Sequence, residues 1–154
     1  MSLRAPLRLA LLAAGGALAI AGCETVEEEV NEEIGNRFIA QMSGAMEVPP
    51  ADPDGTGMAR ITVNDATNRV CTDLEVREIG MVTAAHIHRG APGVNGPPVV
   101  TLDPPDNNDS DDCDTVDDAL VDEIRRNPAA FYVNVHTTDY PDGAVRGQVN
   151  EVLD

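Results

Sequence analysis

The sequence predicts an all-β protein: an antiparallel, Greek-key-like β-sandwich with one short capping helix. From Arg37 onward, short apolar or alternating runs are separated by Gly, Pro, Asn and Asp. Turn signals such as Asp54-Gly55 lie between these runs. Several short strands with this punctuation are typical of antiparallel sandwiches and barrels. The expected strands are residues 37–44, 56–64, 69–79, 82–88, 98–102, 131–137 and 143–150.

One helix is expected before the last two strands. Residues 115–118 offer an N-cap threonine with an acid three positions later, which is a helix-start signal. Val116, Leu120 and Ile124 fall on one helical face. Pro128 ends the pattern, because the residue before a proline is biased away from helical geometry. We expect this helix to cover an open end of the sandwich.

The segment before the helix is strongly acidic, with eight aspartates in residues 103–118. One interpretation is a calcium loop. The spacing does not match an EF-hand, because the glycine at the sharp turn and the closing glutamate are missing. We therefore expect a solvated loop with turn and cap residues.

The N-terminus predicts export from the cytoplasm. Residues 1–22 combine a basic start with a short apolar stretch, the pattern of a signal peptide; the stretch is too short to span a membrane. The ending Ile20-Ala21-Gly22-Cys23 resembles a bacterial lipobox. That resemblance implies cleavage before Cys23 and membrane attachment through lipid on its sulfur. The alternative is an ordinary cleaved signal followed by an unrelated cysteine.

Beyond the signal peptide, residues 23–36 contain six glutamates and are expected to form an acidic tether. Residues 37–154 then form a single β domain. Glu24 resembles the sorting pattern of outer-membrane lipoproteins, which implies a location in the cell envelope, anchored on the periplasmic or surface face. The formal net charge of −17, with no lysine, argues against binding to nucleic acid or to an anionic membrane surface by charge.

The two remaining cysteines, Cys71 and Cys113, form an even pair in an oxidising compartment. We predict one disulfide between them. Two free buried thiols are the alternative.

The chain contains only three histidines, and all three lie in expected strands. Side chains at i and i+2 of a strand point to the same face, so His86 and His88 project together, roughly 6–7 Å apart at Cα. A third imidazole from His136 on a neighbouring strand would complete a three-nitrogen site that suits copper or zinc. The alternative is a structural role, in which each ring bonds to loop carbonyls and fixes residues 90–97 to the sheet.

Other polar residues are candidates for support of this site. Ligand histidines usually donate their second N–H to an acceptor, and Asn134 and Gln148 are expected to accept it. Arg146 would orient an anion or water near the metal, or pair with a surface acid. Glu47 is either a ligand or base at the site, or an acid in the turn before Pro49; we favour the turn.

Several spaced motifs resemble the CHRD (chordin) domain family, over about Arg37 to Val152. They are SGAMEVPP at 43–50, AHIHRG at 85–90, GVNGP at 93–97, VNVHT at 133–137 and PDGAVRGQ at 141–148. The resemblance implies a compact β-rich domain of secreted proteins, including bacterial envelope proteins, and implies little about activity. The His-x-His strand also resembles the copper strand of copper/zinc superoxide dismutases. Three histidines are too few for that dinuclear site, so no activity is carried over.

Together these features predict an envelope-anchored, non-catalytic copper- or zinc-binding module. The alternative is a metal-free protein-interaction or surface-adhesion module, favoured by the long polar loops rich in Pro and Gly. A hydrolase has little support. No serine or cysteine lies in an activating context, although a zinc-hydroxide mechanism needs only three ligands and an open position.

Overall fold

The computed structural model describes residues 35–152. The expected signal peptide, the lipidation site Cys23 and nearly all of the acidic tether lie outside these residues. Within residues 35–152, no helix is both long and apolar enough to cross a bilayer.

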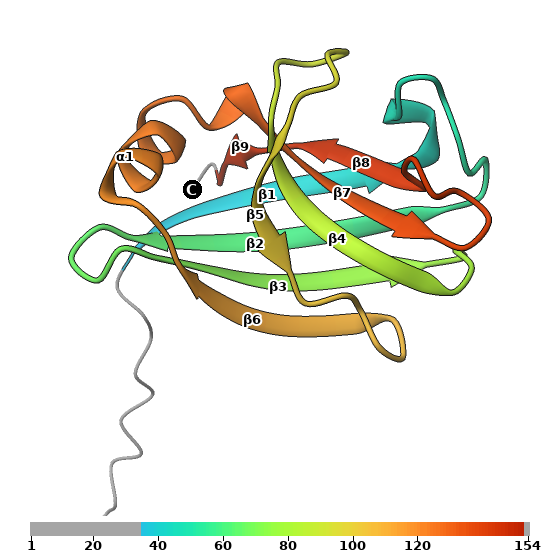
Figure 1. The fold of residues 1–154 in the computed structure, drawn as a ribbon, viewed down its shortest axis with the longest axis horizontal. Helices are drawn as coiled ribbons and strands as arrows, with labels where there is room; N and C mark the ends of the chain where they lie inside the picture. The colour runs from blue at the N-terminus through green and yellow to red at the C-terminus, as the bar shows by residue number, and fades with distance from the viewer. Residues whose placement is uncertain (1–34, 153–154) are drawn as a thin grey trace, which may run out of the picture. The chain divides into compact units, whose positions relative to one another are not determined.

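The described chain is predominantly β-structure, with one short α-helix and two 3-10 turns (Figure 1). The all-β prediction with a single helix is therefore confirmed. The strands are β1 (Asn36–Ser43), β2 (Thr56–Asn64), β3 (Arg69–Arg77), β4 (Val82–Arg89), β5 (Pro98–Leu102), β6 (Asp109–Thr115), β7 (Phe131–Thr137), β8 (Val145–Gln148) and β9 (Asn150–Glu151). The helical elements are η1 (Gly44–Met46), α1 (Asp118–Arg126) and η2 (Pro128–Ala130).

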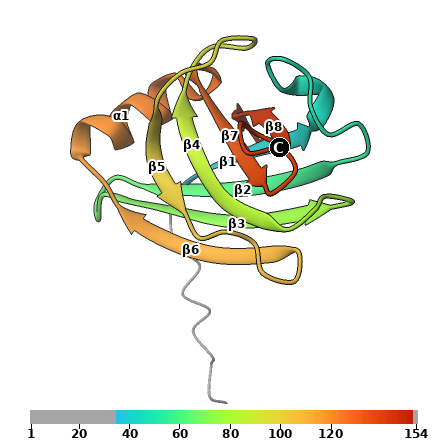
Figure 2. The ribbon, with the colours of Figure 1, turned by 45° about the vertical axis from the view of Figure 1, so that its right-hand side comes forward.

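The strands of residues 35–152 form one continuous sheet in the order β5-β4-β7-β8-β1-β2-β3-β6, with β9 paired to β1. All the pairings are antiparallel. The sheet curls so that the half containing β4, β5 and β7 lies over the half containing β2, β3 and β6 (Figure 2). The two edge strands, β5 and β6, are in contact. The two layers of a sandwich are thus halves of a single curved sheet.

The core fills the space inside the curled sheet. Its side chains come from every second residue of the strands. Ile87, Val133 and Val145 come from one half of the sheet, and Ile61 and Leu74 come from the other; each is at most 1% exposed. Because side chains alternate along a strand, the residues between these point outward.

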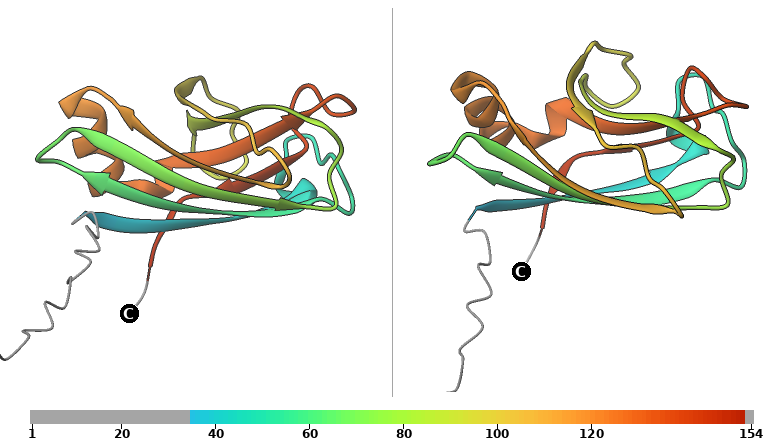
Figure 3. Two further views of the ribbon diagram at one scale, coloured as in Figure 1. Left: turned by 90° about the horizontal axis from the view of Figure 1, so that it is seen from below. Right: turned by 60° about the horizontal axis from the view of Figure 1, so that its bottom comes forward.

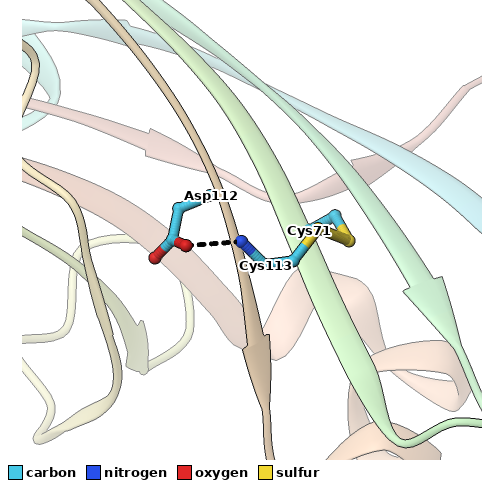
Figure 4. Close-up of a disulfide and its surroundings, with 3 residues drawn as sticks. All are labelled: Cys71, Asp112 and Cys113. Atoms are coloured by element: carbon cyan, nitrogen blue, oxygen red, sulfur yellow. Dashed lines mark hydrogen bonds between the residues drawn. A yellow bond between two sulfur atoms is a disulfide. The ribbon is translucent and has the colours of Figure 1, made fainter.

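The disulfide prediction is confirmed, and it reveals a strand that sequence patterns miss. Cys71 of β3 and Cys113 of β6 lie directly opposite each other in the ladder and are bonded (Figure 4). The expectation of a loop was wrong for residues 109–115, which form edge strand β6. Acidic residues are depleted in strands, so its sequence reads as a loop. Pairing with β3 and the covalent link to Cys71 outweigh that local preference.

The helix lies where it was expected, but its start and its buried face differ: Asp117 is the N-cap, and the expected cap Thr115 is the last residue of β6. Val121 and Ile124 are its fully buried residues, whereas Val116 and Leu120 pack only partly against the core. The helix lies at one end of the curled sheet, beside the β2–β3 turn (Figures 1 and 2). An ion pair of 3.0 Å between Arg125 and Asp65 of that turn holds it there.

Strand β7 is buried on both of its faces. Phe131, Val133 and Val135 face the core, while Tyr132 and Asn134 alternate with them and are each only 2% exposed. A strand with solvent on one side would expose those two side chains. Loops must therefore cover the outer face here, and the candidate site, whose three histidines are half-buried, lies beside this cover.

Candidate metal centre

The strand register gathers the three histidines on the outer face of the sheet. Across the β4–β7 ladder, His86 lies opposite Asn134, His88 opposite Tyr132, and His136 opposite Ala84. Directly opposed residues of antiparallel strands share a face. The histidines therefore occupy three successive rows of one face, with His86 between the other two.

The three imidazoles are close enough to act together. His86 Nδ1 lies 3.2 Å from His136 Nε2, and one ligand-type nitrogen from each histidine lies within 4.8 Å of the other two. The ring centroid of His86 is 5.5 Å from that of His88 and 5.1 Å from that of His136. Within residues 35–152, this is the one group of three or more His, Cys, Asp or Glu with that proximity. The aspartate-rich segment contributes no comparable group there.

Backbone carbonyls fix two of the rings. His88 Nδ1 lies 2.8 Å from the carbonyl oxygen of Gly96, and His136 Nδ1 lies 2.9 Å from that of Pro141. A carbonyl only accepts, so each Nδ1 carries the proton and each Nε2 keeps its lone pair. This is the usual support of a ligand histidine. The expected acceptors Asn134 and Gln148 do not take this role, because the β4–β5 and β7–β8 loops bring carbonyls closer.

His88 is the most constrained of the three histidines. Its ring stacks on Tyr132, with centroids 4.8 Å apart and planes at 11°. Its Nε2 is buried and has no hydrogen-bond partner. A buried ring nitrogen with a free lone pair is what a histidine prepared for a metal presents.

The surroundings favour neutral rings. Burial lowers the pKa of His86, and the neighbouring His136 and His88 lower it further. Burial also lowers the pKa of His88, partly opposed by its hydrogen bond to Gly96. Since metals bind the deprotonated ring nitrogen, both shifts reduce competition from protons.

A buried ion pair lies beside the histidines. Glu47 is 4% exposed and Arg146 is 6% exposed, with 3.2 Å between Oε2 and Nε. Glu47 Oε1 also accepts a hydrogen bond from Asn134 Nδ2. Burial raises the pKa of Glu47, while Arg146 and Asn134 act to lower it. Glu47 lies in the turn before Pro49, as expected, but its side chain turns inward and contacts Asn134 of β7 and Arg146 of β8.

The two other predicted support residues also bond elsewhere. Arg146 lies over the Tyr132 ring, 3.9 Å from its centroid, and donates to Asn95 Oδ1. It pairs with an acid, as one of its expected roles had it, but that acid is the buried Glu47 and not a surface residue. Gln148 Nε2 donates to the carbonyls of Gly90, Ala129 and Phe131. Within residues 35–152, no hydrogen bond joins Asn134, Arg146 or Gln148 to a histidine.

Two glycines allow the loops to approach this closely. Gly143 has φ +135°, and a Cβ there would lie 2.5 Å from both Asn134 Nδ2 and Glu47 Oε1. A Cβ on Gly96 would lie 1.7 Å from the Arg89 carbonyl oxygen. Figure 3 shows the β1–β2 and β7–β8 loops side by side at one end of the sheet, where residues 47–51 and 139–143 line a cavity of about 310 Å³.

The family model of the CHRD domain matches residues 38–149. The chain belongs to the CHRD family. Comparisons with curated proteins and with solved structures gave no match. The three histidines, the Glu47–Arg146 pair and the disulfide all lie within the matched segment of this CHRD domain.

The loop carbonyls that the structural alternative expected are present, at Gly96 within residues 90–97 and at Pro141, whereas Asn95 and the contact of Glu47 with Asn134 were not expected from the sequence. Glu47 is 87 residues from Asn134 along the chain, so no local pattern joins them. A weak signal was present in Pro141-Asp142-Gly143, because a glycine turn directly after a histidine strand folds backbone carbonyls toward that strand.

Proposed function

We propose that this CHRD domain binds one copper or zinc ion through His86, His88 and His136, as a non-catalytic module of an envelope lipoprotein. The observation that carries the proposal is the 3.2 Å separation of His86 Nδ1 and His136 Nε2. Two nitrogens that each lie about 2.0–2.1 Å from one metal are roughly 2.9–3.4 Å apart at bond angles of 90–109°. Without metal these two nitrogens form a hydrogen bond, in which His86 Nδ1–H donates to the lone pair of His136 Nε2. A metal ion that replaces this proton would find the two nitrogens at the spacing of neighbouring ligands.

Further support comes from the third ring and from the chemistry of the set. His88 offers a buried, unpartnered Nε2 on the same face, and a ring nitrogen of His88 lies within 4.8 Å of ring nitrogens of the other two histidines. Imidazole nitrogens without thiolates suit copper and zinc rather than calcium or magnesium. Three protein ligands also leave a position for a further group.

The proposal is tested on the full-length protein, purified in mild detergent. After equilibration with Cu²⁺ or Zn²⁺ and removal of free metal, we expect one ion per chain. The His86→Ala/His88→Ala variant should retain less than about a tenth of that, since removing two of three ligands destroys the chelate. Thr101→Val is the matched control, because Thr101 is the exposed β5 neighbour of His86. Equal, sub-stoichiometric metal in all three proteins would sink the proposal.

The second candidate is a metal-free protein-interaction module. It is favoured by exposed apolar side chains on the covering loops: Met46 is 52% exposed, Val48 37% and Val94 53%. Asn95 Nδ2 donates to the Val48 carbonyl, at 2.8 Å, and so joins the two loops into one surface. In this case the histidine variants would lose thermal stability to the same extent with and without added metal.

A further inference from the structure

The amide of Asn134 has one satisfied end and one unsatisfied end. Its Nδ2 donates to Glu47 Oε1, whereas its Oδ1 is buried and has no partner. The residue is 2% exposed, so bulk water does not supply the missing donor. A buried amide oxygen without a donor is costly, and such atoms usually mark a bound water, ion or ligand.

The charge of Glu47 determines which end of the Asn134 amide has no hydrogen-bond partner. An ionised carboxylate only accepts hydrogen bonds, and Arg146, with its Nε 3.2 Å from Glu47 Oε2, favours the ionised form. The nitrogen of Asn134 must therefore face Glu47, and its oxygen must point away.

The strand register indicates where that oxygen points. Asn134 lies between Arg146 on β8 and His86 on β4. Glu47 binds Arg146 and so lies toward β8, and on this register Oδ1 is expected to face β4, where the histidines lie. The unpartnered Nε2 of His88 belongs to the same face. Two buried atoms without partners thus accompany the three-histidine cluster. The lone pair of His88 Nε2 has no partner, and Asn134 Oδ1 receives no hydrogen bond.

We propose that a water molecule bound to the metal at the three-histidine site donates a hydrogen bond to Asn134 Oδ1, and that small anions exchange with this water. The inference rests on the function proposed above. Three histidine ligands leave a position open for water, and a metal-bound water is a strong donor. The oxygen of Asn134 favours ligands that carry a proton over ligands such as azide that carry none.

The first measurement needs no variant. The full-length protein is loaded with one equivalent of Cu²⁺, and pulsed electron paramagnetic resonance is compared in H₂O and D₂O. We expect imidazole nitrogen couplings together with strongly coupled exchangeable protons. Azide should replace those protons and produce an azide-to-copper charge-transfer band. Histidine-bound copper without exchangeable protons and without an azide response would overturn this inference and leave the proposed metal site standing.

Two variants then test the role of the amide. Asn134→Val removes the acceptor, so azide should bind about 3- to 10-fold more tightly, as expected for loss of one hydrogen bond to the competing water. In Glu47→Gln, Arg146 retains the carbonyl oxygen and the new NH₂ group faces Asn134. The Asn134 amide must then flip and present Nδ2 to the metal side. The affinity for azide should therefore rise at least as much as in Asn134→Val.

Thr101→Val, on the opposite side of His86 in the same row, should leave azide affinity unchanged. Azide affinity that is unaltered in both Asn134→Val and Glu47→Gln contradicts the inference. If Asn134→Val does not fold, the azide affinity of Glu47→Gln decides alone. Absence of copper binding by the wild-type protein would instead defeat the proposed function, and this inference with it.

Discussion

Metals bind the neutral form of imidazole, and the surroundings of His86 and His88 favour that form. Burial is the largest cause of the lowered pKa at both residues. The unfolded chain therefore binds more protons than the folded one as pH falls through about 6.5, the ordinary histidine value. Stability from this source is present above that pH and is lost below it.

This effect predicts a difference between two metal-free proteins. Thermal unfolding is measured with chelator present at pH 7.5 and pH 5.5, a window of about one unit on either side of the ordinary histidine value. The wild-type protein should lose more stability over this window than His86→Gln/His88→Gln does, because only the wild type carries the two imidazoles. The raised pKa of Glu47 acts with the opposite sign, but it is common to both proteins and cancels in the difference. A variant whose pH dependence equals that of the wild type would refute the assignment of lowered pKa values.

Gly143 is a second residue whose substitution tests the site. At φ +135° an alanine is strained, and its Cβ would press on Asn134 and Glu47. We expect Gly143→Ala to destabilise the protein by about 1–3 kcal/mol. Gly93→Ala is the matched control, since Gly93 also has a positive φ, of +78°, but a Cβ at that position would have no neighbouring atom within 4 Å. Equal unfolding midpoints for the two variants would contradict the close approach of the loop.

At the scale of elements, the disulfide is what secures the acidic edge. β6 is an edge strand whose neighbour in the sheet is β3. Its aspartates repel one another. Cys71→Ser/Cys113→Ser should cost about 4 kcal/mol by the entropy of a loop of this length, with strain and residual structure reducing that figure. Hydrogen exchange should accelerate first in β6 and only later in β4 and β7. Uniform acceleration along the chain would show that β6 does not depend on the link.

The elements also show how far sequence alone reaches. Period-two alternation correctly placed His86 and His88 on one face and found most strands within a few residues. It failed for β6, where a ladder partner and a disulfide outweigh an acidic composition. It also joined β8 and β9 into one strand, although the chain changes partner there: Val149 still bonds to Phe131 in the β7–β8 register, whereas β9 pairs with β1. Local patterns do not report such long-range pairings.

The candidate site was predictable to the same extent. The three histidines were expected together from strand spacing and scarcity. Loop carbonyls were expected as acceptors only under the structural alternative, and the sequence did not identify which ones, because a backbone carbonyl has no sequence signature. The contact of Glu47 with Asn134 was not expected, because the tertiary fold alone brings the two residues together.

For the whole molecule, the prediction concerns its location in the cell, and it rests on N-terminal residues outside the described part of the chain. The lipobox-like Ile20–Cys23 sequence predicts that the mature protein fractionates with membranes and carries lipid on Cys23. Cys23→Ser should move the protein to the soluble envelope fraction, as seen by immunoblot, without changing its unfolding midpoint. Membrane association that persists in this variant would point to another anchor.

The central claim is that His86, His88 and His136 bind one metal ion together. The most direct measurement is X-ray absorption at the metal edge of the full-length protein loaded with one equivalent of Cu²⁺ or Zn²⁺. We predict three imidazole nitrogens at about 2.0 Å, and loss of this signature in His86→Ala/His88→Ala. A spectrum with fewer than three imidazoles, or one unchanged in the variant, would contradict the claim.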